Sequence, residues 1–355
     1  MNITWLIGNG FDLNLGMRTS YKSFISEAYL SENENQWSEA KRTLVERAGG
    51  PSKTELWSDL EALLGAVSEN YDAADENEVE LFHEGWEGLL EELEAYLVKE
   101  DDEFLKVGLS KEEVEEFWDS IVHLGSRLKA KDADVVDVFS RSPYNHRYVF
   151  VTLNYTHTVD TFLKDAKKAH SPFNERVVVG TYRDSAGDPM HVHGVLAPDG
   201  RGEIVMGLSE PAQIANAHLA SSEDALQLWL KERRNDFYRN RRNEQLKRSI
   251  DDSDVIVIYG CSLGESDVYI WKQICDWVMG SAARRLLVLD HGVPPSGTCH
   301  LREFQKARKA IISKFASYGG GTGDQIAILE ERMVVENSDV VFAFGRWPGP
   351  DPFAD

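Results

Sequence analysis

Two residues of this chain have side chains suited to catalysis and occur where apolar runs end. Asn154 follows one such run, and His193 belongs to the segment His191 to Gly194. A neutral imidazole accepts a proton near pH 7, so His193 is a candidate general base. Ligands of an α/β sheet bind beyond the carboxyl ends of its strands, so Asn154 is placed to contact one. The alternative is that Asn154 or Thr156 caps the helix that follows.

The two histidines of that segment, His191 and His193, are separated by one residue. On a strand, this spacing places both imidazoles on one face. Such a pair can begin a zinc site, but the neighbouring sequence indicates no third and fourth ligand. We therefore expect no metal, and we expect His191 to be a structural histidine held by hydrogen bonds.

A glycine-containing loop follows the first apolar run, Ile3 to Ile7. Glycines at a strand-to-helix turn let backbone N–H groups approach a phosphate, and the N-terminus of the next helix favours negative charge. The loop is thus a candidate nucleotide-binding element, although a tight turn that needs a positive φ explains the glycines equally well. It comprises Gly8, Asn9, Gly10, Phe11 and Asp12.

A second loop of this kind begins at Gly260, after another apolar run. Ser262 is a candidate ligand of a phosphate or a ribose, and Asp290, at the end of a further run, is a candidate partner of ribose hydroxyls. The spacing Gly-x-Ser-x-Gly around Ser262 also matches the nucleophile elbow of hydrolases. The downstream acid and histidine for a triad, Asp290 and His291, are adjacent, which is poor triad geometry.

Short β-branched and aromatic runs alternate with stretches of helical periodicity, which is typical of βαβ units. Near-continuous apolar runs such as Val255 to Ile258 indicate parallel strands covered on both faces. The sequence therefore predicts an α/β fold with a doubly wound, mostly parallel sheet. The expected strands are Ile3–Ile7, Arg147–Leu153, Arg176–Val179, Met190–His193, Asp254–Tyr259 and Arg285–Leu289, and expected helices are Thr156–Ala169, Glu265–Met279 and Leu301–Lys314.

The formal net charge of -22 comes almost entirely from one segment. Residues 55–119 contain 23 of the 60 acidic side chains and only 3 of the 38 basic ones. Leucines recur there at helical spacing, so we expect a large acidic helical insertion over 31–143 with a solvated charged face. The α/β domain then comprises 1–30 and 144–355, and it carries a second, basic helical insertion at about 209–250.

Composition also restricts partners and compartment. No apolar run approaches the roughly 18 residues that span a bilayer. The three cysteines show no close CxxC spacing, which fits a reducing cytoplasm. A strong net negative charge repels nucleic acid and anionic membranes. We therefore expect a cytoplasmic protein with no membrane partner, and contact with nucleic acid only through the basic residues 231–248.

Six motifs of the chain, taken in order, resemble the bacteriophage abortive-infection AbiH family over about residues 3–290. AbiH proteins in turn resemble the sirtuin-like, NAD-consuming Rossmann-type fold. In sirtuins a Gly-Ala-Gly turn, an Asn after a strand, a His-Gly pair and a Gly-Thr-Ser loop line the cofactor cleft. The chain departs from sirtuins in having no visible zinc module and Thr156 in place of an acid, which argues against protein deacylation. The motifs are Leu6–Leu13, Thr19–Phe24, Leu56–Glu61, Leu153–Thr156, His191–Gly194 and Gly260–Asp267.

The resemblance implies an abortive-infection effector that binds NAD⁺ and hydrolyses its bond between nicotinamide and ribose. It implies that Asn154 orients the ribose or the attacking water and that His193 is the base. It further implies that the cofactor-binding residues are Gly8, Asn9, Gly10 and Phe11 at the pyrophosphate, Asp12 at the nicotinamide ribose, Tyr155, Gly260, and Ser262 with Asp290 at the adenosine end.

Two other functions remain open from the sequence. One is a nucleotide-regulated effector that acts on nucleic acid through residues 231–248, although a salt-bridged surface explains those charges as well. The other is a sensor that binds NAD or ADP-ribose without turnover. We expect the acidic insertion to mediate self-association into a homo-oligomer or to shield the cleft, and a phage-derived trigger to activate the protein.

Overall fold

The computed structural model describes residues 1–31, 33–50, 59–129, 142–177, 180–197, 202–237, 241–295 and 300–346. Several features singled out above lie outside these residues. They are the Leu56-Trp57-Ser58 part of the third motif, residues 178 and 179 of an expected strand, residues 238–240 of the basic stretch 231–248, and one of the three cysteines, Cys299.

The described residues form one mixed sheet of eight strands, in which all paired strands except β3 and β4 run parallel. This confirms the α/β fold with a mostly parallel sheet. The order is β3-β4-β2-β1-β6-β7-β8, with β5 paired to β2. The strands are β1 (Asn2–Ile7), β2 (Arg147–Thr152), β3 (Asn174–Val177), β4 (Thr181–Ala186), β5 (Met190–His191), β6 (Val255–Tyr259), β7 (Arg285–Asp290) and β8 (Met333–Asn337).

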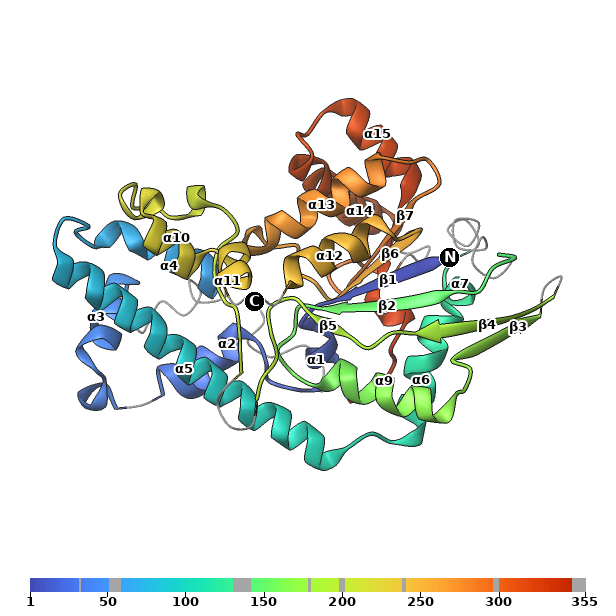
Figure 1. Cartoon of the computed structure of the whole chain (residues 1–355), viewed down its shortest axis with the longest axis horizontal. Coiled ribbons are helices and arrows are strands. Elements are labelled where there is room, and N and C mark those ends of the chain that lie inside the picture. Colours follow the sequence, from blue (N-terminus) through green and yellow to red (C-terminus); the bar gives the residue numbers. More distant parts are fainter. Residues whose placement is uncertain are drawn as a thin grey trace.

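Side-chain alternation along β1 explains why helices cover both faces of the sheet. Trp5 points to one face and packs with residues of α6 and α9, whereas Leu6 points to the other and packs with residues of α12 to α15. Figure 1 shows these two groups of helices on opposite sides of the strands. The helices of the sheet layers are α1 (Gly10–Asn14), α6 (Lys111–Val122), α7 (Leu124–Arg127), α9 (Thr158–Ala169), α12 (Arg242–Asp251), α13 (Val268–Met279), α14 (Leu301–Tyr318) and α15 (Gly323–Arg332).

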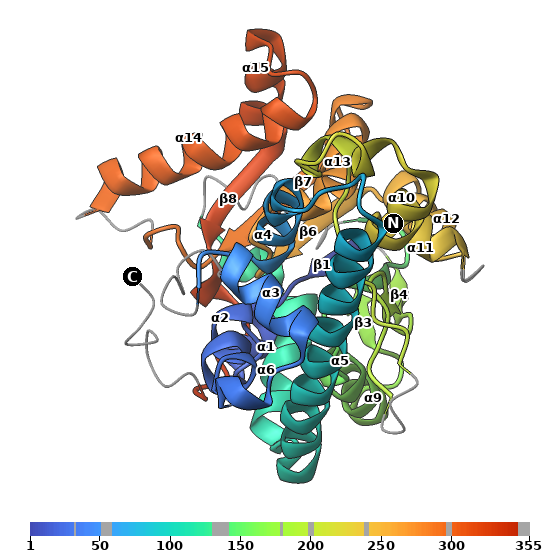
Figure 2. The same cartoon turned by 90° about the vertical axis from the view of Figure 1, so that its left-hand side faces the viewer.

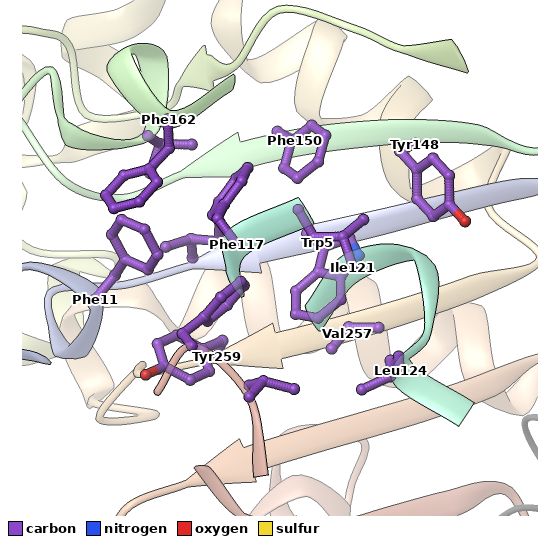
Figure 3. Close-up of a cluster of buried hydrophobic side chains, with 14 of the residues drawn as sticks. Trp5, Phe11, Phe117, Ile121, Leu124, Tyr148, Phe150, Phe162, Val257 and Tyr259 are labelled. Atoms are coloured by element: carbon purple, nitrogen blue, oxygen red, sulfur yellow. The ribbon is translucent and has the colours of Figure 1, made fainter. Parts of the chain in front are cut away.

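Aromatic rings fill the space between the sheet and α6. Phe11 at the start of α1 packs edge to face on Phe162 of α9, with ring centroids 5.4 Å apart, and Phe117 of α6 lies 5.0 Å from Phe162. Figure 3 shows these rings beside Trp5 and Phe150. The ring of Phe11 is therefore a core side chain.

The remaining helices form a helical lobe, defined here as α2 to α5 together with residues 204–237. Residues of both predicted insertions share its core, where the rings of Trp86 and Trp229 stack with centroids 6.0 Å apart. Figures 1 and 2 show α3, α4, α5 and α10 together at the end of the molecule away from β3 and β4. The lobe's helices are α2 (Tyr21–Phe24), α3 (Glu39–Arg47), α4 (Leu60–Val67), α5 (Glu76–Val107), α10 (Glu223–Trp229) and α11 (Lys231–Phe237).

The long helix α5 connects the lobe with the sheet layers. Its residues from Phe82 to Leu97 belong to the core of the lobe, whereas Phe104, one turn before its end, belongs to the core beneath the sheet. The next helix, α6, packs on the sheet through Phe117 and Ile121. The segment expected as one insertion over 31–143 thus contributes to both parts of the molecule.

The position of β1 fixes where a ligand can bind. β1 lies between β2 and β6, and the chain first builds the sheet on the β2 side and then on the β6 side. At such a switch point, the loops that follow neighbouring strands diverge and leave a crevice at the carboxyl ends of the strands. Each of the candidate residues from the sequence lies close to this edge.

Candidate functional site

A cavity of about 610 Å³ opens at the carboxyl ends of β1, β2, β6 and β7. This volume is within the usual range of small-molecule sites. The acidic insertion supplies part of its wall through Asp59, Glu61 and Leu97. Residues of the sheet loops that line the cavity include Gly8, Asn9, Gly10, Asp12, Asn154, Tyr155, Thr156, His193, Gly260, Ser262, Asp267 and Asp290.

Asn154 brings an unsatisfied amide into this cavity. The residue is 4% exposed, and neither Nδ2 nor Oδ1 has a hydrogen-bond partner among the described residues. Its backbone is held in place, because its N–H donates to Thr152 Oγ1 and its carbonyl lies 3.1 Å from Nδ1 of His191. A buried amide without partners is costly for a folded protein, so this side chain is suited to a ligand that supplies both a donor and an acceptor.

His193 faces a buried group of charges. Its Nε2 lies 3.1 Å from Oδ1 of Asp267, without the alignment of a hydrogen bond among the described residues. The ammonium of Lys231 lies 2.8 Å from that same oxygen and 3.0 Å from the carboxylate of Glu61. Lys231 and His193 hold the pKa of Asp267 well below its usual range despite its burial, whereas burial raises the pKa of Glu61.

Asp12 is a second buried acid at the cavity, 1% exposed at the start of α1. Its two carboxylate oxygens accept hydrogen bonds from Thr156 at 2.7 Å and from Thr158 at 2.6 Å. Burial raises the pKa of Asp12 to about 6, and the hydrogen bonds from these two hydroxyl groups limit the rise. The group therefore exchanges its proton close to neutral pH, as catalytic acids and bases do.

The two glycine loops pack against each other, and several of their backbone N–H groups bond within the fold. The N–H groups of Gly8 and Gly10 donate to the carbonyls of Tyr259 and Gly260, and that of Phe11 donates to Gly8. A Cβ at Gly10 would lie 2.6 Å from the Cα of Gly260. The glycines thus allow contact between the loops, and these three donors are already used.

The side chains of the first loop have structural partners as well. Asn9 exchanges hydrogen bonds with Thr19, donating from Nδ2 to its carbonyl and accepting from its hydroxyl. Phe11 is not among the described residues that line the cavity, because its ring points into the core. The side chain of Asn9 and the backbone N–H groups of Gly8, Gly10 and Phe11 thus have partners within the protein, and the expected phosphate contacts stay a prediction.

The other end of the cavity is more open to solvent. Ser262 is exposed there, and Asp290 is half-buried and accepts a hydrogen bond from the N–H of Gly292 at 2.7 Å. His291, considered above only for a triad, and Lys314, which the sequence analysis did not single out, also line the cavity. An exposed ammonium and a hydroxyl group in one cavity suit a phosphate or ribose of a bound nucleotide.

The paired histidines have separate environments. β5 ends at His191, so His193 lies in the following turn, and the expected strand through His193 is shorter than predicted. His191 bridges the carbonyl of Asn154 and the carboxylate of Asp160, as expected of a structural histidine. Within the described part of the chain, no three His, Cys, Asp or Glu residues are grouped as metal ligands.

Sequence reasoning missed the partners of His193. Asp267 lies in η7 (Glu265–Asp267) at the end of a recognised motif, but no role was assigned to it. Glu61 is the one charged residue in the sequence of α4, a local signal that it serves a buried purpose. Lys231 directly follows the apolar residues Trp229 and Leu230, but its burial depends on contacts that are distant in sequence.

The basic stretch 231–248 is engaged mainly in ion pairs. Arg233 pairs with Glu223, Arg242 with Glu203 and Lys247 with Asp251. The acidic partners of these three basic residues therefore lie outside α5. Where the structure describes the chain, none of its helices has the length and apolar character to span a bilayer.

Comparison with known proteins places the chain in a family. The family model described as bacteriophage abortive infection AbiH matches residues 4–288, which include the described residues that line the cavity except Asp290, His291 and Lys314. No curated protein and no solved structure matches the chain. The match covers well over half of the 355 residues. The chain therefore belongs to the AbiH family of bacteriophage abortive-infection proteins.

Proposed function

We propose that this AbiH protein binds NAD⁺ in the cavity and hydrolyses the bond between nicotinamide and ribose. The observation that carries the proposal is the buried, unsatisfied amide of Asn154, in one cavity with His193 and the ionisable Asp12. The sirtuin-like relationship inferred from the sequence motifs is part of the same proposal, and the placement of β1 at a switch point of the sheet supports it.

The chemistry requires stabilisation of a positive charge. Departure of nicotinamide leaves an oxocarbenium-like ribose, which buried carboxylates stabilise. Asp12 supplies such a carboxylate at neutral pH, held by two threonine hydroxyls. In this proposal Asp12 faces the nicotinamide ribose, and Asn154 orients a ribose hydroxyl or the attacking water.

His193 acts as the base in the proposed reaction. Water adds to the anomeric carbon, nicotinamide leaves with the electron pair of the broken C–N bond, and His193 takes the proton that water releases. The products are nicotinamide, ADP-ribose and a proton. Because Nε2 of His193 lies 3.1 Å from the carboxylate of Asp267, Nδ1 is in this proposal the nitrogen that serves the ligand.

The polar exit of the cavity fits the remainder of the dinucleotide. Ser262, Asp290 and Lys314 line this end, and Lys314 supplies a positive charge for the pyrophosphate that the glycine amides do not supply. The adenosine ribose then lies near Ser262 and Asp290. In this proposal the pyrophosphate lies nearer Lys314 than the sequence motifs alone predict.

The test is incubation of the purified protein with NAD⁺, followed by chromatographic detection of nicotinamide and ADP-ribose. The proposal predicts both products in equal amounts, and their loss in His193→Ala with the variant still folded. NAD⁺ binding without any product would identify a sensor. Absence of both binding and turnover would refute the proposal.

A further inference from the structure

We infer that Asp267 and Lys231 are positioning residues for His193, and that the helical lobe completes the candidate site through them. The inference deepens the proposed function and rests on it for its catalytic consequence. Its structural part concerns the protonation pattern of one imidazole and is measurable without substrate.

One carboxylate oxygen connects the three side chains. Oδ1 of Asp267 lies 2.8 Å from Nζ of Lys231 and 3.1 Å from Nε2 of His193. A carboxylate oxygen beside Nε2 favours the tautomer that carries its proton on that nitrogen. Nδ1 is then left as an acceptor. Contacts of this kind are often poorly aligned in a ligand-free site and tighten when the ligand binds.

The charged and polar groups around His193 come from four parts of the chain. They are Asp267 in η7, Lys231 in α11, Glu61 in α4 and the phenol of Tyr155 after β2. Lys231 is 1% exposed, and its ammonium contacts the carboxylates of both Glu61 and Asp267. It therefore holds both buried acids in position. A buried pair of acids without that ammonium would repel, and Asp267 would lose its fixed position.

The lobe holds the turn that carries Asp267. The hydroxyl of Ser209 donates to the carbonyl of Ser266, and Nε2 of Gln213 donates to that of Glu265. The N–H of Gly207 donates to Glu61, and the ammonium of Lys231 donates to the same carboxylate, which links the two insertions directly. The orientation of His193 therefore depends on both insertions being packed against η7, and this gives the insertions a role in the site itself.

Nitrogen-15 NMR of the full-length protein with labelled histidine tests the inference, at a pH where the imidazoles are neutral. His193→Gln assigns the resonances. Wild-type protein is expected to show the Nε2–H tautomer, and an Nδ1–H tautomer would overturn the inference. Asp267→Ala is expected to give a mixture of tautomers, whereas Asp267→Asn keeps Nε2–H because its amide oxygen still accepts. An unchanged spectrum in folded Asp267→Ala would also overturn it.

Lys231 is tested in the same spectra. Lys231→Met is expected to shift the Nε2 resonance of His193, and the surface variant Lys247→Met is the matched control that leaves it in place. The shift is expected to vanish in the Asp267→Ala background, since Lys231 acts through Asp267. If Lys231→Met shifted the Nε2 resonance equally with and without Asp267, the inference that Lys231 acts through Asp267 would be contradicted.

Kinetics separate this inference from the proposed function. With NAD⁺, Asp267→Ala is expected to lower kcat at least about tenfold with KM changed less than about threefold, and Asp267→Asn to recover part of the loss. A rise in KM of about tenfold or more with an unchanged kcat would contradict a positioning role. If the tautomer shifts as expected but wild-type protein cleaves no NAD⁺, the positioning stands and the proposed function fails.

Discussion

The backbone carbonyl of Asn154 lies 3.1 Å from Nδ1 of His191, so the first histidine of the pair holds the residue that the second histidine faces across the cavity. Asp160, 2.9 Å from Nε2 of His191, fixes the imidazole from the other side. In the proposed function, His191 therefore positions Asn154 and His193 faces the ligand.

His191→Ala is expected to lower NAD⁺ cleavage by up to about a hundredfold, because a small displacement of Asn154 misplaces the ligand. The loss should be smaller than that of His193→Ala. His191→Gln should recover part of the rate, since its side-chain amide can donate to the same carbonyl. Initial rates of nicotinamide release measure all three, and a wild-type rate in His191→Ala would exclude the positioning role.

The stability of the protein should record the titration of Asp12. Its pKa is raised from 3.8 in the unfolded chain to about 6 in the folded protein. The protonated acid is therefore favoured by folding, and its contribution is present below about pH 4 and lost as the pH rises through 6. The loss amounts to roughly 3 kcal/mol of unfolding free energy.

Asp12→Asn should remove this pH dependence. Urea unfolding at several pH values between 4 and 7 measures it as the difference between wild type and variant, and Glu112→Gln, at an exposed acid, is the control. A difference that stays constant over that range would contradict the burial of an ionisable Asp12. In NAD⁺ cleavage, the wild-type rate should rise with pH through about 6, because the ionised carboxylate is the active form.

Contact between the two glycine loops should make Gly10 intolerant of a side chain. A Cβ there would lie 2.6 Å from the backbone of Gly260, so Gly10→Ala is expected to destabilise the fold by about 1–3 kcal/mol. Gly88→Ala is the matched control, because a Cβ at that position of α5 meets no atom within 4 Å and alanine favours a helix. In thermal unfolding, the Tm should fall in Gly10→Ala and rise slightly in Gly88→Ala.

The buried ammonium of Lys231 should be important for stability as well as for position. Lys231→Met leaves Glu61 and Asp267 without their shared partner and is expected to cost about 3–5 kcal/mol. Adding Glu61→Gln should recover part of this loss, since it removes one of the uncompensated charges. Lys247→Met, on an exposed pair, should change the free energy of unfolding by less than about 0.5 kcal/mol. Equal effects of the two lysine variants in urea would contradict the burial of a charge cluster.

Much of the sheet was predictable because its central strands are apolar throughout. Val255 to Tyr259 is buried at every position, and such a run indicates a strand covered on both faces. β4 escaped prediction because its sequence from Thr181 to Ala186 is mostly polar and partly exposed. β8 escaped because its apolar part is only three residues long, and Glu336 interrupts it although that side chain is buried.

The candidate site was predictable only as far as local motifs reach. Asn154 and His193 follow strands, so the carboxyl edge of a parallel sheet brings them together. The contact between Lys231 and Glu61 joins residues 170 positions apart, and it forms only when two insertions pack on each other. Local periodicity carries no information about such a contact. The use of the glycine amides by neighbouring carbonyls likewise follows from the packing of two loops.

Nicotinamide release in a parallel assay of three proteins tests the central claim most directly. Wild-type protein, Asn154→Ala and the control Asn77→Ala, at an exposed position of α5, are incubated with NAD⁺ under identical conditions. We expect wild type and Asn77→Ala to release nicotinamide at matching rates. In folded Asn154→Ala, the rate of release should fall by about a hundredfold or more. Equal release by all three proteins would contradict the assignment of the reaction to this cavity, and no release by wild type would contradict NAD⁺ hydrolysis itself.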